Sequence, residues 1–175
     1  DPGYRISTRY GSPTPDDLDE LLSLVWKSPS FFIAHPRAIA AFERECTWRR
    51  VPPETTDLFG TKVILWRGVP IIPSDKVEIQ GQYLTNRGVG ITNIILVRTG
   101  EKEQGVVGLH QSGIPGEIAP SLSARLMGLD KYGVASYLLT KYFSLASLTD
   151  DAIAVLENVE VGYYHDYQHR NKVEK

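Results

Sequence analysis

Two β-branched apolar runs on either side of Arg67-Gly68 constrain the fold of this chain more than any other feature. They cover residues 61–67 and 69–73, and the second ends in Pro73-Ser74-Asp75. β-Branched side chains suit a pleated, half-buried surface, and Gly and Pro mark the ends of such runs. The pattern predicts strand, tight reversal, strand. No group in it can catalyse a reaction alone, so it favours a chain that works through its surfaces.

Two segments have the start signals and periodicity of amphipathic helices. Thr14 is a predicted N-cap, followed by Pro15 at the first helical position and acidic residues in the first turn. That helix stops at Ser28-Pro29, and His35-Pro36 opens a second helix that ends near Arg49. The expected buried stripes are Leu18, Leu21, Leu22 and Val25 in the first helix and Ile39, Phe42 and Cys46 in the second.

The remaining elements are predicted mainly from periodicity. Residues 131–147 carry Ala135, Leu138, Leu139 and Tyr142 at helical spacing, which predicts a long helix. A short helix is expected at 121–127, with Ser121 as its cap. Further strands are predicted at 30–34, 92–99, 105–111 and 152–164, the middle two forming a hairpin. This order of elements predicts an α+β fold with a mostly antiparallel sheet and flanking helices.

Composition limits the class of protein. A chain of 175 residues forms one ordinary domain and buries about 70% of its unfolded surface, so it needs no disulfide or metal to fold. Its net charge is −2 and it has no basic stripe, so nucleic-acid binding is not expected. No apolar run approaches the ~18 residues that span a bilayer. A single cysteine fits a reducing cytoplasm.

Several residues could carry chemistry, and each has a structural alternative. Cys46 is a small buried apolar residue in one interpretation and a reactive thiol near Arg49 in the other. His110, Asp75 and Ser112 form a triad only if the fold brings them together; otherwise they are polar residues of loops and a strand edge. We expect no catalytic site.

The histidines offer little evidence for a metal site or a catalytic base. His165 and His169 have the spacing of two metal ligands on one helical face, but no third ligand accompanies them, so a surface tail is expected. His35 precedes Pro36, and we expect it to satisfy a backbone group at the helix start rather than act as a base. The sequence therefore predicts no metal and no cofactor.

Large aromatic residues suggest contact surfaces. Trp26, Trp48 and Trp66 are apolar anchors of a core or an interface, and interfaces are enriched in Trp and Arg. Trp48, Tyr163 and Tyr164 are the predicted subunit-interface residues.

An ordered series of motifs resembles the encapsulin shell proteins, second family, subtype A. The series is Pro29-Ser-Phe-Phe-Ile-Ala-His-Pro-Arg37, a helix, Phe59-Gly60, Trp66-Arg-Gly-Val-Pro-Ile-Ile-Pro-Ser-Asp75, Gly113-Ile-Pro-Gly-Glu-Ile-Ala-Pro120 and Val155-Leu-Glu-Asn-Val-Glu-Val-Gly-Tyr-Tyr164. The resemblance implies the tailed-phage major capsid fold of the Hong-Kong-ninety-seven type. Residues 1–13 would be an arm or linker, about 14–36 and 150–175 the peripheral part, and about 37–149 the axial part.

The resemblance also implies a function. Subunits of this family self-assemble into an icosahedral nanocompartment in the bacterial cytoplasm, and the usual cargo of the subtype is a cysteine desulfurase, whose pyridoxal phosphate belongs to the cargo. The turn from Arg49 to Thr56 is expected to face a pore, lined by Arg49, Arg50, Glu54 and Thr55. Alternatives are a bacteriophage major capsid protein and a small hydrolase or thiol enzyme.

A full subunit of the family is longer than this chain. It has an N-terminal arm, an extended β-loop and a spine helix before the region that resembles this sequence. The chain also opens with Asp1-Pro2-Gly3 rather than Met. We therefore expect a C-terminal fragment of a longer protein.

Overall fold

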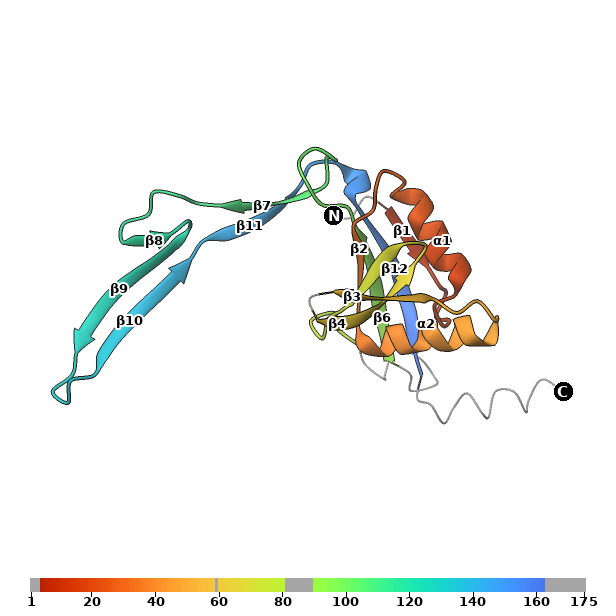
Figure 1. The fold of residues 1–175 in the computed structure, drawn as a ribbon, viewed down its shortest axis with the longest axis horizontal. Helices are drawn as coiled ribbons and strands as arrows, with labels where there is room; N and C mark the ends of the chain where they lie inside the picture. The colour runs from red at the N-terminus through yellow and green to blue at the C-terminus, as the bar shows by residue number, and fades with distance from the viewer. Residues whose placement is uncertain (1–3, 59, 81–89, 163–175) are drawn as a thin grey trace.

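The chain folds into two parts (Figure 1). One is a sheet covered by two helices, and the other is a long β-arm that projects away from that sheet. The computed structural model describes residues 4–58, 60–80 and 90–162. The sheet contains β1 (Tyr4–Ser7), β2 (Phe31–Ala34), β3 (Glu54–Leu58), β4 (Thr61–Trp66), β5 (Val69–Pro73), β6 (Gly90–Val97) and β12 (Ile153–Val161). The helices are α1 (Pro15–Leu24) and α2 (Pro36–Trp48).

The strands of the sheet lie in the order β1-β12-β6-β2-β5-β4-β3. Two neighbouring pairs, β1 with β12 and β2 with β5, are parallel, and the other pairs are antiparallel. The predicted strand–reversal–strand is confirmed as β4 and β5. Arg67 and Gly68 between them have φ angles of 50° and 80°, the positive values that a two-residue turn matching the strand twist requires.

Both helices start as the sequence predicts. At α1 the Thr14 hydroxyl accepts from the Asp17 backbone N–H, and the Asp17 carboxylate accepts from the Thr14 N–H at 2.8 Å. At α2 the N-cap is His35, whose Nδ1 accepts from the Arg37 N–H at 3.1 Å. His35 therefore satisfies a backbone group, as expected.

One face of the sheet packs against both helices to form the core. Alternate residues face it, because successive side chains of a strand point to opposite sides. Trp66 is 3% exposed, packs edge-on against Phe42 with ring centroids 5.1 Å apart, and donates from Nε1 to Asp19 at 2.8 Å. The core contains Leu18, Leu21 and Val25 of the first helical segment, Phe42 and Cys46 of α2, and Phe32, Ile71, Leu96, Ala154 and Leu156 of the sheet.

The arm contains the part of the chain that was predicted as helix. It comprises β7 (Val106–His110), β8 (Glu117–Ala119), β9 (Leu122–Leu129), β10 (Ala135–Lys141) and β11 (Phe143–Ser147), followed by a short 3-10 helix, η1 (Asp150–Ala152). β9 pairs with β8 and β10, and β7 pairs with β11, all antiparallel.

Both helices predicted in this region, 121–127 and 131–147, are therefore wrong. Residues 137–139, Tyr-Leu-Leu, are apolar without interruption, so they match a helical stripe and a strand covered on both faces equally well. Pairing with β9 across the turn at Gly133, whose φ is 79°, decides for the strand.

One other prediction also fails. β6 and β7 do not form a hairpin, because β6 pairs with β12 and β2 while β7 pairs with β11. Within the segment 1–13, predicted as an arm or linker, residues 4–7 form β1, which pairs with β12. Strands of both the predicted peripheral and axial parts share one sheet, and that division of the chain stays a prediction.

Leu156→Ala tests the core. Leu156 is fully buried in β12, so truncation removes apolar contacts and leaves a cavity, and we expect unfolding to become easier by about 2–5 kcal/mol. Leu129→Ala, at a position 70% exposed on the arm, is the matched control and should change stability by less than about 0.5 kcal/mol. Urea unfolding of the chain measures both, and equal losses would contradict the assignment of the core.

Cys46 tests the thiol interpretation. Burial, with a smaller effect from Glu43, raises the pKa of Cys46 to about 11. The thiolate is therefore scarce at pH 8, and a disulfide reagent should label the native chain at least about 100-fold more slowly than the urea-unfolded chain. Similar labelling rates for the native and unfolded chain would restore the reactive-thiol interpretation.

Candidate functional site

The arm carries a dense set of exposed apolar side chains. A two-stranded ribbon has no interior in which to bury them, and such a ribbon is marginally stable alone in water. Exposed apolar surface of this extent marks an interaction site. The large apolar residues that are at least half exposed on the arm are Leu109, Ile118, Leu126, Met127, Leu129, Tyr132, Val134, Tyr137, Leu138, Leu139, Phe143 and Leu145.

Both faces of the ribbon are apolar. Tyr137 lies opposite Leu126, and Leu139 shares their face, whereas Leu138 points to the other side and lies opposite Arg125. All four of the apolar residues are at least half exposed. A strand covered on both faces has such a continuous apolar run. The arm is therefore built to be covered from two sides.

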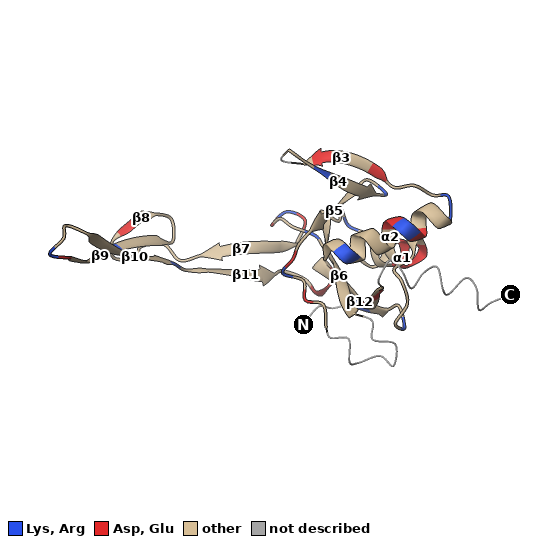
Figure 2. Ribbon diagram, turned by 90° about the horizontal axis from the view of Figure 1, so that it is seen from below, with Lys and Arg blue, Asp and Glu red and all other residues tan. Residues whose placement is uncertain are grey.

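Charged residues are sparse on most of the arm. Figure 2 shows the charges gathered on the two helices and β3, while β7 and β11 carry none. Within β9 and β10 only Arg125 and Lys141 are charged. Interface cores are depleted in charged residues, so this distribution supports a contact surface on the arm.

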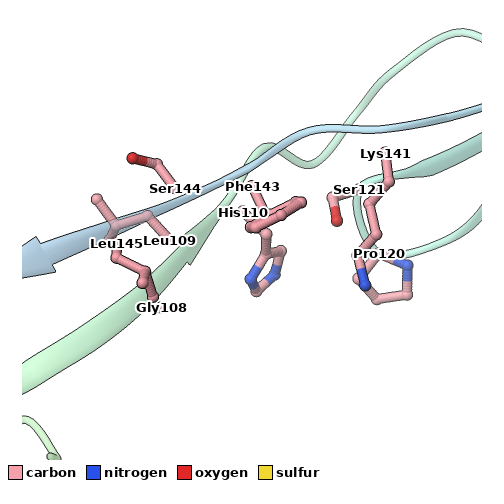
Figure 3. Close-up of a pocket in the computed structure, with 9 residues that line it drawn as sticks. All are labelled: Gly108, Leu109, His110, Pro120, Ser121, Lys141, Phe143, Ser144 and Leu145. Atoms are coloured by element: carbon pink, nitrogen blue, oxygen red, sulfur yellow. The ribbon is translucent and has the colours of Figure 1, made fainter. Parts of the chain in front are cut away.

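A shallow groove of about 340 Å³ lies on the arm where β7 and β11 meet the turn between β8 and β9 (Figure 3). His110 and Phe143 come from the ribbon, and Ser121 comes from the turn. Ser121 is 1% exposed, and its Oγ makes no hydrogen bond in the described part of the chain. His110 lines the same groove, but no hydrogen bond joins it to Ser121 among the described residues.

The base of the arm is a polar junction in which the Arg98 side chain is buried while most of its neighbours stay partly or fully exposed. The Arg98 side chain is fully buried and forms a bidentate ion pair with Asp151, with N–O distances of 2.8 and 3.2 Å. Thr149 Oγ1 accepts from the same guanidinium at 3.0 Å. The hydrogen bonds from Arg98 hold the pKa of the Asp151 carboxyl well below its usual range, so the pair stays charged at neutral pH.

The structure does not assemble the catalytic candidates of the sequence. Asp75 follows β5 beside Ala34, at the end of β2 that pairs with Ile94, whereas the arm that carries His110 leaves from the opposite end, beside Val97. Cys46 is buried in the core. His165, His169, Tyr163 and Tyr164 lie outside the described residues.

Neither a metal site nor a membrane helix is found where the structure describes the chain. No group of three or more His, Cys, Asp and Glu residues within residues 4–58, 60–80 and 90–162 could hold a metal ion. None of the helices in those ranges is long and apolar enough to cross a membrane.

The predicted pore residues lie at one exposed turn. Arg49 is the C-cap of α2, Arg50 has a φ of 59°, and Glu54 and Thr55 begin β3 at the edge of the sheet. The Arg49 guanidinium pairs with Asp16 at 2.6 Å. Trp48, the described interface candidate, is 72% exposed at the end of α2. Their roles in a pore and an interface stay predictions.

Sequence reasoning missed the arm and its base. A signal for the arm exists: Asp130-Lys-Tyr-Gly133 separates two apolar runs, which is typical of a hairpin loop containing Gly. No local signal pairs Arg98 with Asp151, because 53 positions separate them.

The chain matches known shell proteins over most of its length. A family model described as "Type 2A encapsulin shell protein SrpI-like" matches residues 1–163. The type 2A encapsulin shell protein SrpI of Synechococcus elongatus is 58% identical over 168 residues, and a type 2A encapsulin shell protein of Mycobacterium leprae is 56% identical over 167 residues. These alignments cover 96% and 95% of this chain and 52% of each relative.

A solved structure agrees with the sequence comparison. The cryo-EM structure of the holo-SrpI encapsulin complex from Synechococcus elongatus superposes with a TM-score of 0.80 at 59% identity, covering 94% of this chain and 56% of that chain. The expected capsid-like α+β fold is thereby confirmed. This chain spans about half the length of the relatives it matches. The family match over residues 1–163 shows that the chain belongs to the SrpI-like type 2A encapsulin shell proteins.

Proposed function

We propose that this chain is part of a structural shell subunit, which assembles with copies of itself into an icosahedral nanocompartment in the bacterial cytoplasm. The observation that carries the proposal is the β-arm, which exposes apolar side chains on both faces and cannot cover them itself. In an assembled shell these side chains are covered by the rest of the full-length subunit and by neighbouring copies. Closed symmetry multiplies such contacts, so individually modest surfaces suffice for a stable particle.

The subunit is proposed to be structural rather than catalytic. Cys46 is buried with a raised pKa, and Ser121 has no hydrogen-bonded base in the described part of the chain. The proposed cargo is a cysteine desulfurase, as the resemblance to the subtype implies, and the shell is proposed to serve sulfur metabolism. The pyridoxal phosphate of such a cargo would bind to the cargo, so the shell itself needs no cofactor.

Leu139→Asp in the full-length protein tests the role of the arm. A carboxylate placed on the apolar face resists desolvation in a contact, so we expect megadalton particles from the unchanged protein and loss of most particles in the variant. Thr61→Asp, at an exposed position of β4 outside the arm and the predicted pore, is the control for an added charge. Size-exclusion chromatography with electron microscopy measures assembly.

The same preparation tests the cargo. Particles purified from the native host should contain a cysteine desulfurase, identified by mass spectrometry. Particles with a different enclosed protein would reject the desulfurase but keep the shell, and a full-length protein that forms no particles would reject the shell.

Arg50→Glu tests the predicted pore. Arg49 already pairs with Asp16, whereas Arg50 is exposed and makes no ion pair among the described residues, so Arg50 is the better candidate for a free pore charge. We expect the substitution to slow anion entry and to change stability by less than about 0.5 kcal/mol. Lys62→Glu, an equal charge change at an exposed position of β4, is the control.

Stopped-flow uptake of a small anionic dye by variant shells measures the effect of Arg50. Equal uptake rates for the Arg50 variant, the Lys62 variant and the unchanged shell would show that this turn does not line a pore.

A further inference from the structure

The two legs of the arm meet at one place on the sheet. The outgoing leg follows β6 through residues 98–105, and the returning leg reaches β12 through residues 148–152. Figure 1 shows the arm leaving the sheet at this junction and extending far from it. The direction of the whole arm therefore depends on how these two short segments are held.

The Arg98 side chain joins the two legs. From the outgoing leg it donates to both oxygens of Asp151 and to Thr149 Oγ1 on the returning leg. It also reaches the Gln104 carbonyl oxygen at 3.4 Å, and Thr149 Oγ1 donates to that carbonyl at 2.8 Å. One planar guanidinium thus contacts acceptors on both legs, and its rigid fork fixes their relative orientation.

Backbone hydrogen bonds follow the same path. The Arg98 N–H donates to the Ala152 carbonyl at 2.9 Å, and the Leu148 N–H donates to the Gly105 carbonyl at 3.2 Å. The Val106 N–H returns to the Arg98 carbonyl at 2.7 Å. A Cβ at Gly105 would lie 2.4 Å from the Arg98 carbonyl oxygen, so only glycine permits this close approach.

The junction is also fixed to the sheet. The Ser30 N–H donates to the Val97 carbonyl at 2.9 Å, and the Thr99 N–H donates to Ser30 Oγ at 2.9 Å. Ser30, just before β2, therefore holds the backbone on both sides of Arg98, at Val97 and at Thr99. Movement of the arm requires this network to open.

We propose that Arg98 and Asp151 form a clamp that sets the direction of the arm relative to the seven-stranded sheet. Both are positioning residues. Their effect on shell closure rests on the proposed function, because identical subunits close into one particle size only if the angle between their contact surfaces is uniform.

The chemistry of the pair favours orientation over stability as its purpose. In this pair the Arg98 side chain is fully buried, whereas the Asp151 side chain is 25% exposed. Such a pair contributes little net stability, because desolvation of the guanidinium offsets the attraction between the charges, and an apolar pair of similar volume often stabilises as well. A bidentate pair, however, specifies direction, which apolar contacts do not. The arm has two strands near its base and three where β8 joins β9 and β10, and it has no helix-covered core like that of the seven-stranded sheet.

Arg98→Lys and Asp151→Asn in the full-length protein test the clamp. Lysine keeps the charge but lacks the planar fork. Asp150→Asn, which changes the same residue type one position away, is the matched control, because no bond joins Asp150 to Arg98 in the described structure. Hydrogen–deuterium exchange is followed in peptides that cover the two legs and in peptides from β6 and β12.

The clamp predicts a local effect. Amide exchange in the legs should accelerate by about tenfold or more in both clamp variants, as expected for lost hydrogen bonds to a charged group, while β6 and β12 stay protected. The distribution of particle diameters in electron micrographs should broaden. The Asp150 variant should match the unchanged protein in both measurements.

The outcomes separate this proposal from the proposed function. Unchanged exchange in the legs of the Arg98 variant overturns the clamp, even where particles form normally. Accelerated exchange with unchanged diameters supports the clamp on the arm and overturns its effect on closure. Absence of particles from the unchanged protein rejects the shell and leaves the exchange result to decide on the clamp.

Asp151→Asn could lose stability because it leaves the Arg98 charge unpaired, so a second variant tests the clamp without an unpaired charge. The paired substitution Arg98→Met with Asp151→Leu removes both charges and keeps apolar volume at the junction. It should fold, and its legs should exchange as fast as those of the Arg98→Lys variant. Full protection of the legs in this paired variant would overturn the clamp.

Discussion

A two-stranded ribbon cannot bury the apolar side chains that it carries, and the rest of this structure depends on that constraint. Tyr137 and Leu139 project from one face of the arm and Leu138 from the other, so neither face can serve as the wet side of an ordinary sheet. The free energy of covering them is available only from contacts beyond the arm. Such uncovered faces fit the proposed function of a subunit that assembles with copies of itself.

The sheet is the rigid part to which the arm is attached. Its two helices and one apolar face form a continuous core around Phe42, Trp66 and Leu156, which gives the subunit an interior independent of the arm. Within residues 4–58, 60–80 and 90–162, the two legs of the arm join this body at the junction of β6, η1 and β12. Apolar packing makes the body rigid, whereas the proposed clamp sets the direction of the arm through an ion pair between buried Arg98 and partly exposed Asp151.

The elements that sequence predicted well are those specified by local chemistry. The capping box at Thr14, the cap at His35-Pro36 and the turn at Arg67-Gly68 each fix the backbone within a few residues. The wrong helices lie at 121–147, where the apolar residues fit helical and strand periods equally, and the wrong hairpin joined β6 to β7, whose true partners are distant in the chain. Among the described residues the fold keeps Asp75 and His110 apart, and the sequence could not decide this, because the proximity of such common residue types depends on the fold.

By itself the sequence determined the helix starts, the β4–β5 hairpin and, through its ordered motifs, the family of shell proteins. Only the tertiary structure decided that residues 106–147 form a β-arm and that Arg98 meets Asp151. The physical reason is the separation along the chain of the residues that interact. Caps and turns arise from hydrogen bonds between near neighbours, whereas strand pairing and buried ion pairs join residues that are distant in the chain and meet only in the folded molecule.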